Sequence, residues 1–309
     1  MRTSFPDAVR EHACQAGDAV LVGLVGSGIG PSLSPELHER EASRLGVPYR
    51  YRRIDLDEWG LAAAAIGDVV ALTREAGYRG LNITHPCKQA VIPHLDGLSD
   101  DAAALGAVNT VVFEGGRAIG HNTDWSGFTR GLEAGLPGVA RDSVVLLGAG
   151  GAGAAVAHGL LRDGAGTVRI FDLDRDRADA LAASLRDRFG LTRAASGDDL
   201  AAALGAADGL VHATPTGMAA HPGLPLPEHL LRPDLWVADV VYRPLDTELV
   251  TTARAVGARV LDGGRMAVFQ AADALRLFTG TEPDRGRMLR HFDLLARATP
   301  GERRTTDVH

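Results

Sequence analysis

The chain has 309 residues, of which 45% are hydrophobic and 23% charged, so its composition is globular and its length suits two domains. Its formal net charge of -7 argues against binding to nucleic acid or to an anionic membrane surface. Cys14 and Cys87 are its only cysteines, which excludes a disulfide framework and a cysteine-rich zinc site. No run approaches the ~18 apolar residues of a membrane span, and residues 1–18 lack the apolar core of a signal peptide. We therefore expect a cytoplasmic protein without nucleic-acid or membrane partners.

Short apolar runs alternate with helical patterns through the first half of the chain. Strands are predicted at 19–26, 49–56, 79–84 and 109–114. Helices are predicted at 35–45, at 57–76 and, as a short helix, from Pro86. This alternation predicts an α/β domain with a mostly parallel sheet.

The same pattern restarts in the second half. Strands are predicted at 142–148, 168–172, 209–214, 235–241 and 258–262. Two apolar helices follow, the first over 266–278, and residues 301–309 are predicted to be a frayed tail. The restart predicts a domain boundary near residue 125.

A glycine-rich loop stands between the first strand of this second series and the helix that follows it. In VVLLGAGGAGAAVAHGLL (144–161), Gly148, Gly150 and Gly153 have the spacing G-x-G-x-x-G. The first glycine allows a tight turn, the second admits a pyrophosphate, and the third lets the helix pack closely, with its N-terminus at the phosphates. Asp172 ends the next strand, about twenty residues on, where the fingerprint has an acid. The alternative is a glycine-rich turn with a solvated aspartate, but the flanking elements favour a Rossmann-type dinucleotide site.

Asp172 also bears on the choice of dinucleotide. A carboxylate at this position accepts hydrogen bonds from the adenosine ribose and repels a 2′-phosphate, which favours NAD over NADP. Arg175 and Arg177 follow closely and offer an alternative, a clamp for that phosphate. Arginines among aspartates are more often a solvated helix start, so NAD is the preferred interpretation.

Polar residues also stand at successive strand ends in the first half, where α/β sheets place their ligands. They are Ser32, Ser34, Asn82, Thr84, Lys88, Asn109, Thr110, Asn122, Thr123 and Asp124. Each has a structural explanation: Ser34 fits a helix N-cap, and Asn122 and Asp124 fit turns or caps. Together they suit a small polyhydroxylated molecule. A lysine with an aspartate suits removal of a hydroxyl proton while a hydride leaves the same carbon.

The motifs GPSLSPELH, NITHPCKQA, GAVNT, GHNTDWSGF, GAGGAG and MAVFQAADALRLFTG resemble those of the shikimate dehydrogenases in order and spacing. The resemblance covers about residues 20–298. Together with Asp172, the stretches ATPTGMAAHPG (213–223) and DVVYRPLDTELV (239–250) are most similar to the NAD-dependent quinate/shikimate dehydrogenases of actinobacteria. The NADP-linked biosynthetic branch usually has an Asn-Arg pair where Asp172 stands.

The resemblance implies a fold, an activity and roles for individual residues. It implies an N-terminal substrate domain of residues 1–125 plus 265–309, because the last helices of the family fold back, and a doubly wound Rossmann domain of residues 126–264. It implies an oxidoreductase that converts shikimate or quinate to the 3-dehydro acid, in aromatic amino acid biosynthesis (the shikimate pathway) or in quinate catabolism. Lys88 and Asp124 would be catalytic. Substrate would be bound by Ser32, Ser34, Thr84, Asn109, Tyr242 and Gln270. The cofactor would be bound by Gly148, Ala149, Gly150, Gly151, Ala152, Gly153, Asp172, Arg177, Thr214, Pro215 and Gly263.

Some alternatives stay open at this point. Lys88 acts either as a neutral base or as a protonated partner that relays a proton with Asp124. The chain departs from the family at Ser34, where quinate-active relatives often have threonine, and at Cys87, which replaces a more usual aromatic. Rival functions are an NADP-dependent biosynthetic enzyme, a variant for an amino-shikimate, and a non-catalytic sensor of a shikimate-like ligand. The histidines lack metal-ligand spacing, so no metal is expected, and a monomer and a homodimer are both compatible with the sequence.

Overall fold

The computed structural model describes residues 4–297, which divide into two compact units. Unit 1 comprises residues 4–123 and 271–297, and unit 2 comprises Asp124–Gln270. The junctions therefore fall at Thr123 and inside helix α12 (Gly263–Thr279), whereas the boundaries predicted from the sequence lie at 125 and 265. The predicted tail at 301–309 lies outside the described residues.

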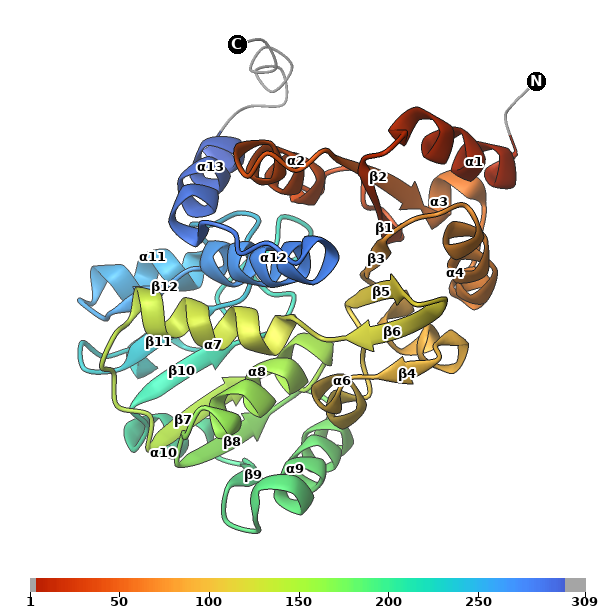
Figure 1. Ribbon diagram of the computed structural model, residues 1–309. Coiled ribbons are helices and arrows are strands. Elements are labelled where there is room, and N and C mark those ends of the chain that lie inside the picture. Colours follow the sequence, from red (N-terminus) through yellow and green to blue (C-terminus); the bar gives the residue numbers. More distant parts are fainter. Residues whose placement is uncertain (1–3, 298–309) are drawn as a thin grey trace. The chain divides into compact units, whose positions relative to one another are not determined.

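Unit 1 contains a six-stranded sheet in the order β2-β1-β3-β5-β6-β4 (Figure 1). Its strands are β1 (Val20–Gly26), β2 (Tyr49–Asp55), β3 (Gly80–Ile83), β4 (Gly97–Leu98), β5 (Thr110–Glu114) and β6 (Arg117–His121). The β1–β2, β1–β3 and β4–β6 pairs are parallel, which confirms the predicted parallel-rich sheet. The antiparallel β3–β5 and β5–β6 pairs were not expected from the sequence.

Short helices surround this sheet. They are α1 (Phe5–Ala16), α2 (Ser34–Arg44), α3 (Leu56–Trp59), η1 (Ala63–Ala65), α4 (Ile66–Glu75), α5 (Cys87–Ala90), η2 (Ile92–His94), α6 (Asp100–Leu105) and α13 (Arg285–Arg297), with the second half of α12. The prediction of one helix over 57–76 is wrong. Gly60 adopts a left-handed conformation with φ of 63° and ends α3, and the extended Ala62 separates it from the next turn.

Unit 2 contains a six-stranded, all-parallel sheet in the order β12-β11-β10-β7-β8-β9. Its strands are β7 (Ser143–Leu147), β8 (Thr167–Phe171), β9 (Ala194–Ser196), β10 (Gly209–His212), β11 (Trp236–Asp239) and β12 (Val260–Leu261). Its helices are α7 (Asp124–Gly135), α8 (Gly151–Arg162), α9 (Arg175–Phe189), α10 (Leu200–Gly205), η3 (Glu228–Leu230), α11 (Glu248–Ala255) and the first half of α12. The strand order reverses direction at β7, which makes its carboxyl end the switch point of a doubly wound fold.

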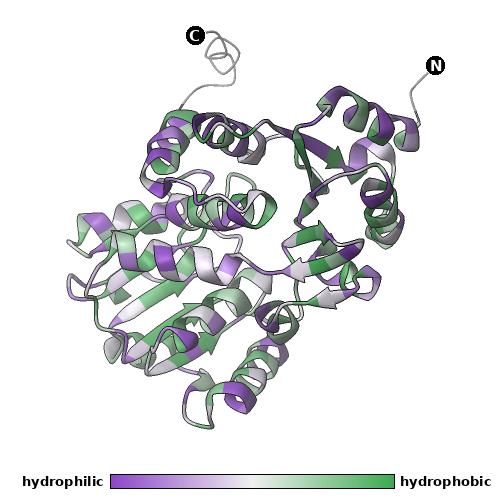
Figure 2. Ribbon diagram, in the orientation of Figure 1, coloured by the Kyte–Doolittle hydropathy of each residue, from purple (hydrophilic) through white to green (hydrophobic). Residues whose placement is uncertain are grey.

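Helices cover both faces of the unit 2 sheet. Alternate residues of β7 point to opposite sides: Val144 and Leu146 pack with α7, α8 and α9, whereas Val145 and Leu147 pack with α10 and α11. Figure 2 accordingly shows these strands mainly in the hydrophobic colour. A strand buried on both faces reads as a continuous apolar run, which explains why the sequence predicted this sheet well.

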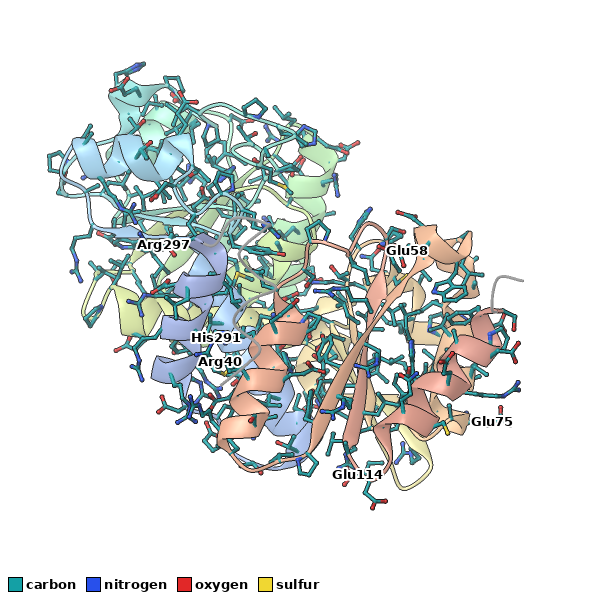
Figure 3. All side chains as sticks on the ribbon, turned by 90° about the horizontal axis from the view of Figure 1, so that it is seen from above. Arg40, Glu58, Glu75, Glu114, His291 and Arg297 are labelled. Carbon is teal, nitrogen blue, oxygen red and sulfur yellow. The ribbon has the colours of Figure 1, made fainter. Side chains whose placement is uncertain are left out.

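Helix α13 is joined to helix α2 by an ion pair whose carboxylate is buried. The carboxylate of Glu41, which is 2% exposed, accepts hydrogen bonds from Arg287 Nη2 at 2.6 Å and Nε at 2.8 Å. The backbone N–H of Asp284 donates to the same carboxylate at 2.8 Å. His291 lies beside Arg40 in Figure 3, and burial together with this arginine lowers the pKa of His291 to about 4. Helix α13 therefore fixes the helix that begins at Ser34.

Candidate active site

Three strand ends bring the predicted polar residues of unit 1 together. Asn82 near the end of β3 pairs with Thr110 at the start of β5, and Thr110 pairs with His121 at the end of β6. Because β5 runs antiparallel to both neighbours, its amino end lies beside their carboxyl ends. Residues from three separate segments thus share one edge of the sheet.

The side chain of Asn109 joins two of these segments. It is 3% exposed, and its carboxamide oxygen accepts from the Thr123 N–H at 2.8 Å and from Thr110 Oγ1 at 3.0 Å. Its Nδ2 donates to Thr123 Oγ1 at 3.0 Å. Asn122 donates in turn to the carbonyl of Ala107 at 3.0 Å. The strand ends are therefore held by side-chain hydrogen bonds, and Asp124 follows directly from the fixed Thr123.

Tyr51 extends this array toward the serines, and the sequence analysis missed it. Its hydroxyl donates to Asn82 Oδ1 at 2.8 Å, and Asn82 Nδ2 donates to Thr110 Oγ1 at 3.1 Å. Burial raises the pKa of Tyr51 well above its usual value, whereas a hydrogen bond with the Ser34 side chain opposes this shift. The phenol is therefore a neutral link between two of the segments. The alternation of tyrosine and arginine in YRYRRID (49–55) was the available signal that it faces inward.

The two serines lie in the loop between β1 and α2. Ser32 Oγ donates to Ser34 Oγ at 3.2 Å, and Arg53 Nη2 donates to the Ser32 carbonyl at 2.7 Å. The interpretation of Ser34 as a helix N-cap is wrong: Leu33 occupies that position in a helical conformation, and the Ser34 N–H donates to Ser32 Oγ at 3.3 Å. The Ser34 hydroxyl thus does not serve the helix end, and it contacts Ser32 and Tyr51 instead.

Thr84 and Lys88 lie just beyond β3. The Thr84 N–H donates to the carbonyl of Val25 at 2.9 Å, which holds this turn against β1. The carbonyl of Lys88 accepts from Val108 N–H at 2.8 Å, which ties α5 to the residue before Asn109. Lys88 is partly buried, whereas Cys87 next to it is fully buried. A one-turn helix fixed in this way gives Lys88 a defined position relative to Asn109.

In unit 2, the glycine loop has the geometry that a dinucleotide requires. Gly148 has φ of 104°, and a Cβ there would lie 2.6 Å from the carbonyl oxygen of Ala213. A Cβ at Gly153 would collide with the carbonyl oxygen of Gly148. By contrast, nothing lies within 4 Å of a Cβ at Gly150 or Gly151, at the N-terminus of α8. The loop is therefore closely packed at Gly148 and Gly153 and open at Gly150 and Gly151, where a pyrophosphate would bind.

Asp172 and the arginines behind it lie at the end of β8. Asp172 Oδ2 accepts from the Ala149 N–H at 2.7 Å and Oδ1 from the Asp174 N–H at 2.9 Å. A carboxylate has about four acceptor positions, so it retains capacity for ribose hydroxyls. Arg175 pairs with Asp179 and Asp198, whereas the exposed Arg177 guanidinium has no ion pair within residues 4–297.

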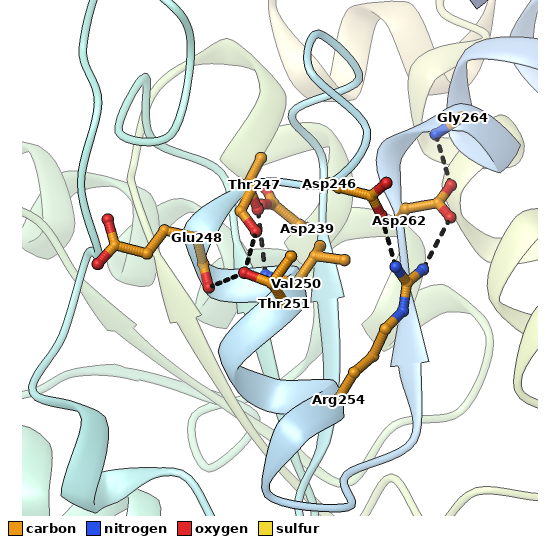
Figure 4. A network of polar contacts seen from close by, with 9 residues as sticks. All are labelled: Asp239, Asp246, Thr247, Glu248, Val250, Thr251, Arg254, Asp262 and Gly264. Atoms are coloured by element: carbon orange, nitrogen blue, oxygen red, sulfur yellow. Dashed lines mark hydrogen bonds and ion pairs between the residues drawn. The ribbon is translucent and has the colours of Figure 1, made fainter. Parts of the chain in front are cut away.

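A polar network fixes the loop that carries Tyr242 and the start of α12 at Gly263 (Figure 4). Arg254 Nη1 donates to Asp246 at 2.6 Å and Nη2 to Asp262 at 3.4 Å, and Asp262 accepts from the Gly264 N–H at 3.1 Å. Tyr242 is 39% exposed. The start of α12 is thereby tied to the loop after β11.

Gln270 ends unit 2 within α12. It is partly buried, and its Nε2 donates to the carbonyl of Ala267 at 3.1 Å. The amide of Gln270 is therefore hydrogen-bonded to the backbone of its own helix.

The candidate residues therefore form one set in each unit. Ser32, Ser34, Thr84, Lys88 and Asn109 belong to unit 1, whereas Asp124, Tyr242, Gln270 and the dinucleotide loops belong to unit 2. Within the described part of the chain, no three acidic, histidine or cysteine side chains group as metal ligands, and no helix has the length and apolar character to cross a membrane.

Known proteins are similar to both units. Residues 24–111 match the family described as Shikimate dehydrogenase substrate binding domain. A Streptomyces avermitilis protein named shikimate dehydrogenase (NADP(+)) is 63% identical over 281 residues, 90% of this chain and 97% of that protein. A Corynebacterium efficiens protein named quinate/shikimate dehydrogenase (NAD(+)) is 49% identical over 279 residues, 89% of this chain and 98% of that protein.

A solved structure of quinate dehydrogenase from Corynebacterium glutamicum in complex with NAD superimposes with a TM-score of 0.84 at 47% identity. It covers 89% of this chain and 99% of that chain. These matches confirm the resemblance that the motifs indicate: the chain belongs to the shikimate dehydrogenase family.

Proposed function

We propose that the chain oxidises a ring hydroxyl of shikimate, and of quinate, to the 3-dehydro acid, with NAD as the preferred hydride acceptor. The main structural support is the array of hydroxyl and amide groups around Asn109, next to the one-turn helix that carries Lys88. The names of the relatives, shikimate and quinate/shikimate dehydrogenase, support the same chemistry. The test is to mix the chain with NAD and either shikimate or quinate and to follow the reduction of NAD by absorbance.

Unit 2 is proposed as the dinucleotide-binding domain and unit 1 as the substrate domain. The open space at Gly150 and Gly151, the helix N-terminus and the acceptor capacity of Asp172 support this assignment. The proposed dinucleotide residues are Gly148, Ala149, Gly150, Gly151, Ala152, Gly153, Asp172, Arg177, Thr214, Pro215 and Gly263. A dinucleotide held by these residues would supply a nicotinamide ring as the hydride acceptor.

The substrate residues are proposed by their chemistry. Ser32, Ser34 and Tyr242 carry hydroxyls that can donate to a carboxylate. Thr84, Asn109 and Gln270 offer both donors and acceptors, which suits ring hydroxyls. The hydrogen bonds that already hold Asn109 support this role, because a preorganised amide does not have to be ordered when the ligand binds.

Lys88 and Asp124 are the proposed catalytic pair. Oxidation of an alcohol requires removal of the hydroxyl proton as the hydride leaves. Lys88 either takes this proton as a neutral amine or, protonated, stabilises the developing alkoxide while Asp124 relays the proton. In both cases the residue has to be held in position, and the hydrogen bond from the Val108 N–H to the Lys88 carbonyl, which fixes the Lys88 backbone, supports such a role.

NAD is proposed as the preferred nucleotide because of Asp172. Its carboxylate would accept from the ribose hydroxyls and repel a 2′-phosphate. The relatives include enzymes named for NADP and enzymes named for NAD, so their names do not determine which nucleotide this chain prefers. The exposed Arg177, without an ion pair in residues 4–297, favours an NADP-dependent biosynthetic enzyme as the second candidate.

The acidic net charge and the few cysteines support a cytoplasmic enzyme with small-molecule substrates, acting as a monomer or homodimer.

The pocket for the carboxylate is expected to decide between the two acids. Both present the same ring hydroxyl, but quinate has a tetrahedral carbon with an extra hydroxyl beside its carboxylate. Ser34 lacks the methyl group of threonine and so packs less tightly there. We expect both acids to be oxidised with shikimate favoured in kcat/KM, and Ser34→Thr to shift the ratio toward quinate by about 1 kcal/mol or less, the scale of one methylene.

Ser43→Thr is the matched control, because it adds the same methyl group on an exposed position of α2. It should leave the ratio of the two kcat/KM values unchanged. Undetectable quinate oxidation at millimolar concentration, with good shikimate turnover, would contradict the expected dual activity.

A further inference from the structure

His212 and Asp239 form a fully buried pair at the carboxyl ends of β10 and β11. The two residues are direct partners in the parallel ladder, and both side chains are 0% exposed. His212 Nδ1 lies 2.9 Å from Asp239 Oδ1. Burying such a pair is costly unless each polar atom has a partner, so the remaining contacts show what the pair holds.

Asp239 accepts hydrogen bonds from three directions. Besides His212, the Val241 N–H donates to Oδ1 at 3.0 Å and Thr247 Oγ1 donates to Oδ2 at 2.7 Å. Figure 4 shows the contact with Thr247. Nδ1 is the ring nitrogen of His212 that faces Asp239, which leaves the other ring nitrogen, Nε2, for a second contact.

Nε2 contacts Thr214. His212 Nε2 lies 2.5 Å from Thr214 Oγ1, so a hydrogen bond links the ring to the threonine hydroxyl. The Thr214 oxygen accepts in turn from the Thr216 N–H at 3.3 Å. The hydroxyl is thus fixed from both sides, and the rotamer of Thr214 is fixed with it.

Thr214 borders the glycine loop of the proposed dinucleotide site. A Cβ at Gly148 would lie 3.0 Å from Thr214 Cγ2. In the sheet, β7 separates β10 from β8, so Thr214 and Asp172 lie on opposite sides of the switch point. A dinucleotide binds across this point, and Asp172 belongs to the adenosine side. Thr214 therefore borders the other half, which carries the nicotinamide.

We propose that His212, oriented by Asp239, is a positioning residue that fixes Thr214 for the nicotinamide half of the dinucleotide. This inference rests on the proposed function, because it assumes that the glycine loop binds a dinucleotide. It assigns His212 an effect on one half of the ligand. A histidine that only stabilises the fold would affect both halves alike.

The experiment compares NAD with ADP, which has the adenosine and both phosphates but no second nucleoside. His212→Asn retains a donor for Asp239 but cannot reach Thr214, and Thr214→Val removes the hydroxyl itself. Calorimetric titration is expected to show each variant binding NAD about fivefold more weakly, the size of one neutral hydrogen bond, with ADP affinity unchanged. The double variant should bind NAD no more weakly than either single variant, because both break the same link.

Thr247→Val is the matched control, since it removes a different donor of Asp239 and leaves His212 and Thr214 in place. It should lower the melting temperature without changing the ratio of NAD to ADP affinity. Equal weakening of NAD and ADP by His212→Asn, or unchanged NAD binding, would overturn the inference alone. A wild-type chain that binds ADP but neither NAD nor NADP would overturn the proposed function as well.

Discussion

Replacement of Lys88 by alanine is expected to lower kcat by roughly 10² to 10⁴, the usual range for a positioned acid–base group. The substitution removes the amine at the hydroxyl that loses its proton. The KM for shikimate should change much less, because the serines and Asn109 remain in place. Steady-state kinetics with saturating nucleotide measures both values.

Two further variants sharpen this test. Gln89→Ala is the matched control on the same one-turn helix, where Gln89 is exposed, and it should retain wild-type kcat. Lys88→Arg retains the positive charge but cannot act as a neutral base. It should be more active than Lys88→Ala only if the protonated lysine stabilises the alkoxide. A near wild-type kcat for Lys88→Ala would remove Lys88 from the mechanism.

The wild-type enzyme should have a kcat/KM at least about tenfold higher with NAD than with NADP, which corresponds to ~1.4 kcal/mol. Hydrogen bonds from the ribose to Asp172 and repulsion of the 2′-phosphate both contribute. Asp172→Ser should narrow the gap, chiefly through weaker NAD binding, because its hydroxyl has fewer acceptor positions and no charge. Asp172 also accepts a hydrogen bond from the Ala149 N–H. Its loss should therefore make the glycine loop less ordered and weaken NAD binding further.

Arg177→Gln separates the two cofactor assignments. If NAD is preferred, this variant should change NAD kinetics much less than NADP kinetics, because NAD lacks the 2′-phosphate that the exposed guanidinium would bind. A wild type that prefers NADP, with Arg177→Gln reversing that preference, would replace the NAD assignment by the biosynthetic alternative.

The sequence predicted unit 2 better than unit 1, for a physical reason. Strands buried on both faces, such as β7 (Ser143–Leu147), are continuous apolar runs with a clear start and end. The strand β6 (Arg117–His121) is short and has polar ends, so its hydropathy gives little signal. Gly115 and Gly116, both with positive φ angles, form the hairpin turn before it. A Gly-Gly pair is typical of a two-residue hairpin, so the sequence did contain a signal for this antiparallel pair.

The candidate site divides in the same way. Local motifs predicted the turn with Lys88 and the glycine loop, because each lies within one short segment. The Tyr51–Asn82 and His212–Asp239 hydrogen bonds join residues far apart in the chain, and only the strand register brings them together. The prediction that Ser34 is the helix N-cap is wrong because the helix begins one residue earlier than it assumes. Leu33 is the N-cap residue, and its backbone is already helical.

The most direct test of the account is a set of assays in which the purified chain is mixed with shikimate or quinate and with NAD or NADP. We expect NAD to be reduced with both acids, and faster with shikimate. The kcat/KM with NADP should be at least about tenfold lower than with NAD. The folded state and dinucleotide binding are checked in the same preparation by calorimetric titration. A chain that binds NAD but reduces neither nucleotide with either acid would contradict the account and leave a non-catalytic sensor of a shikimate-like ligand.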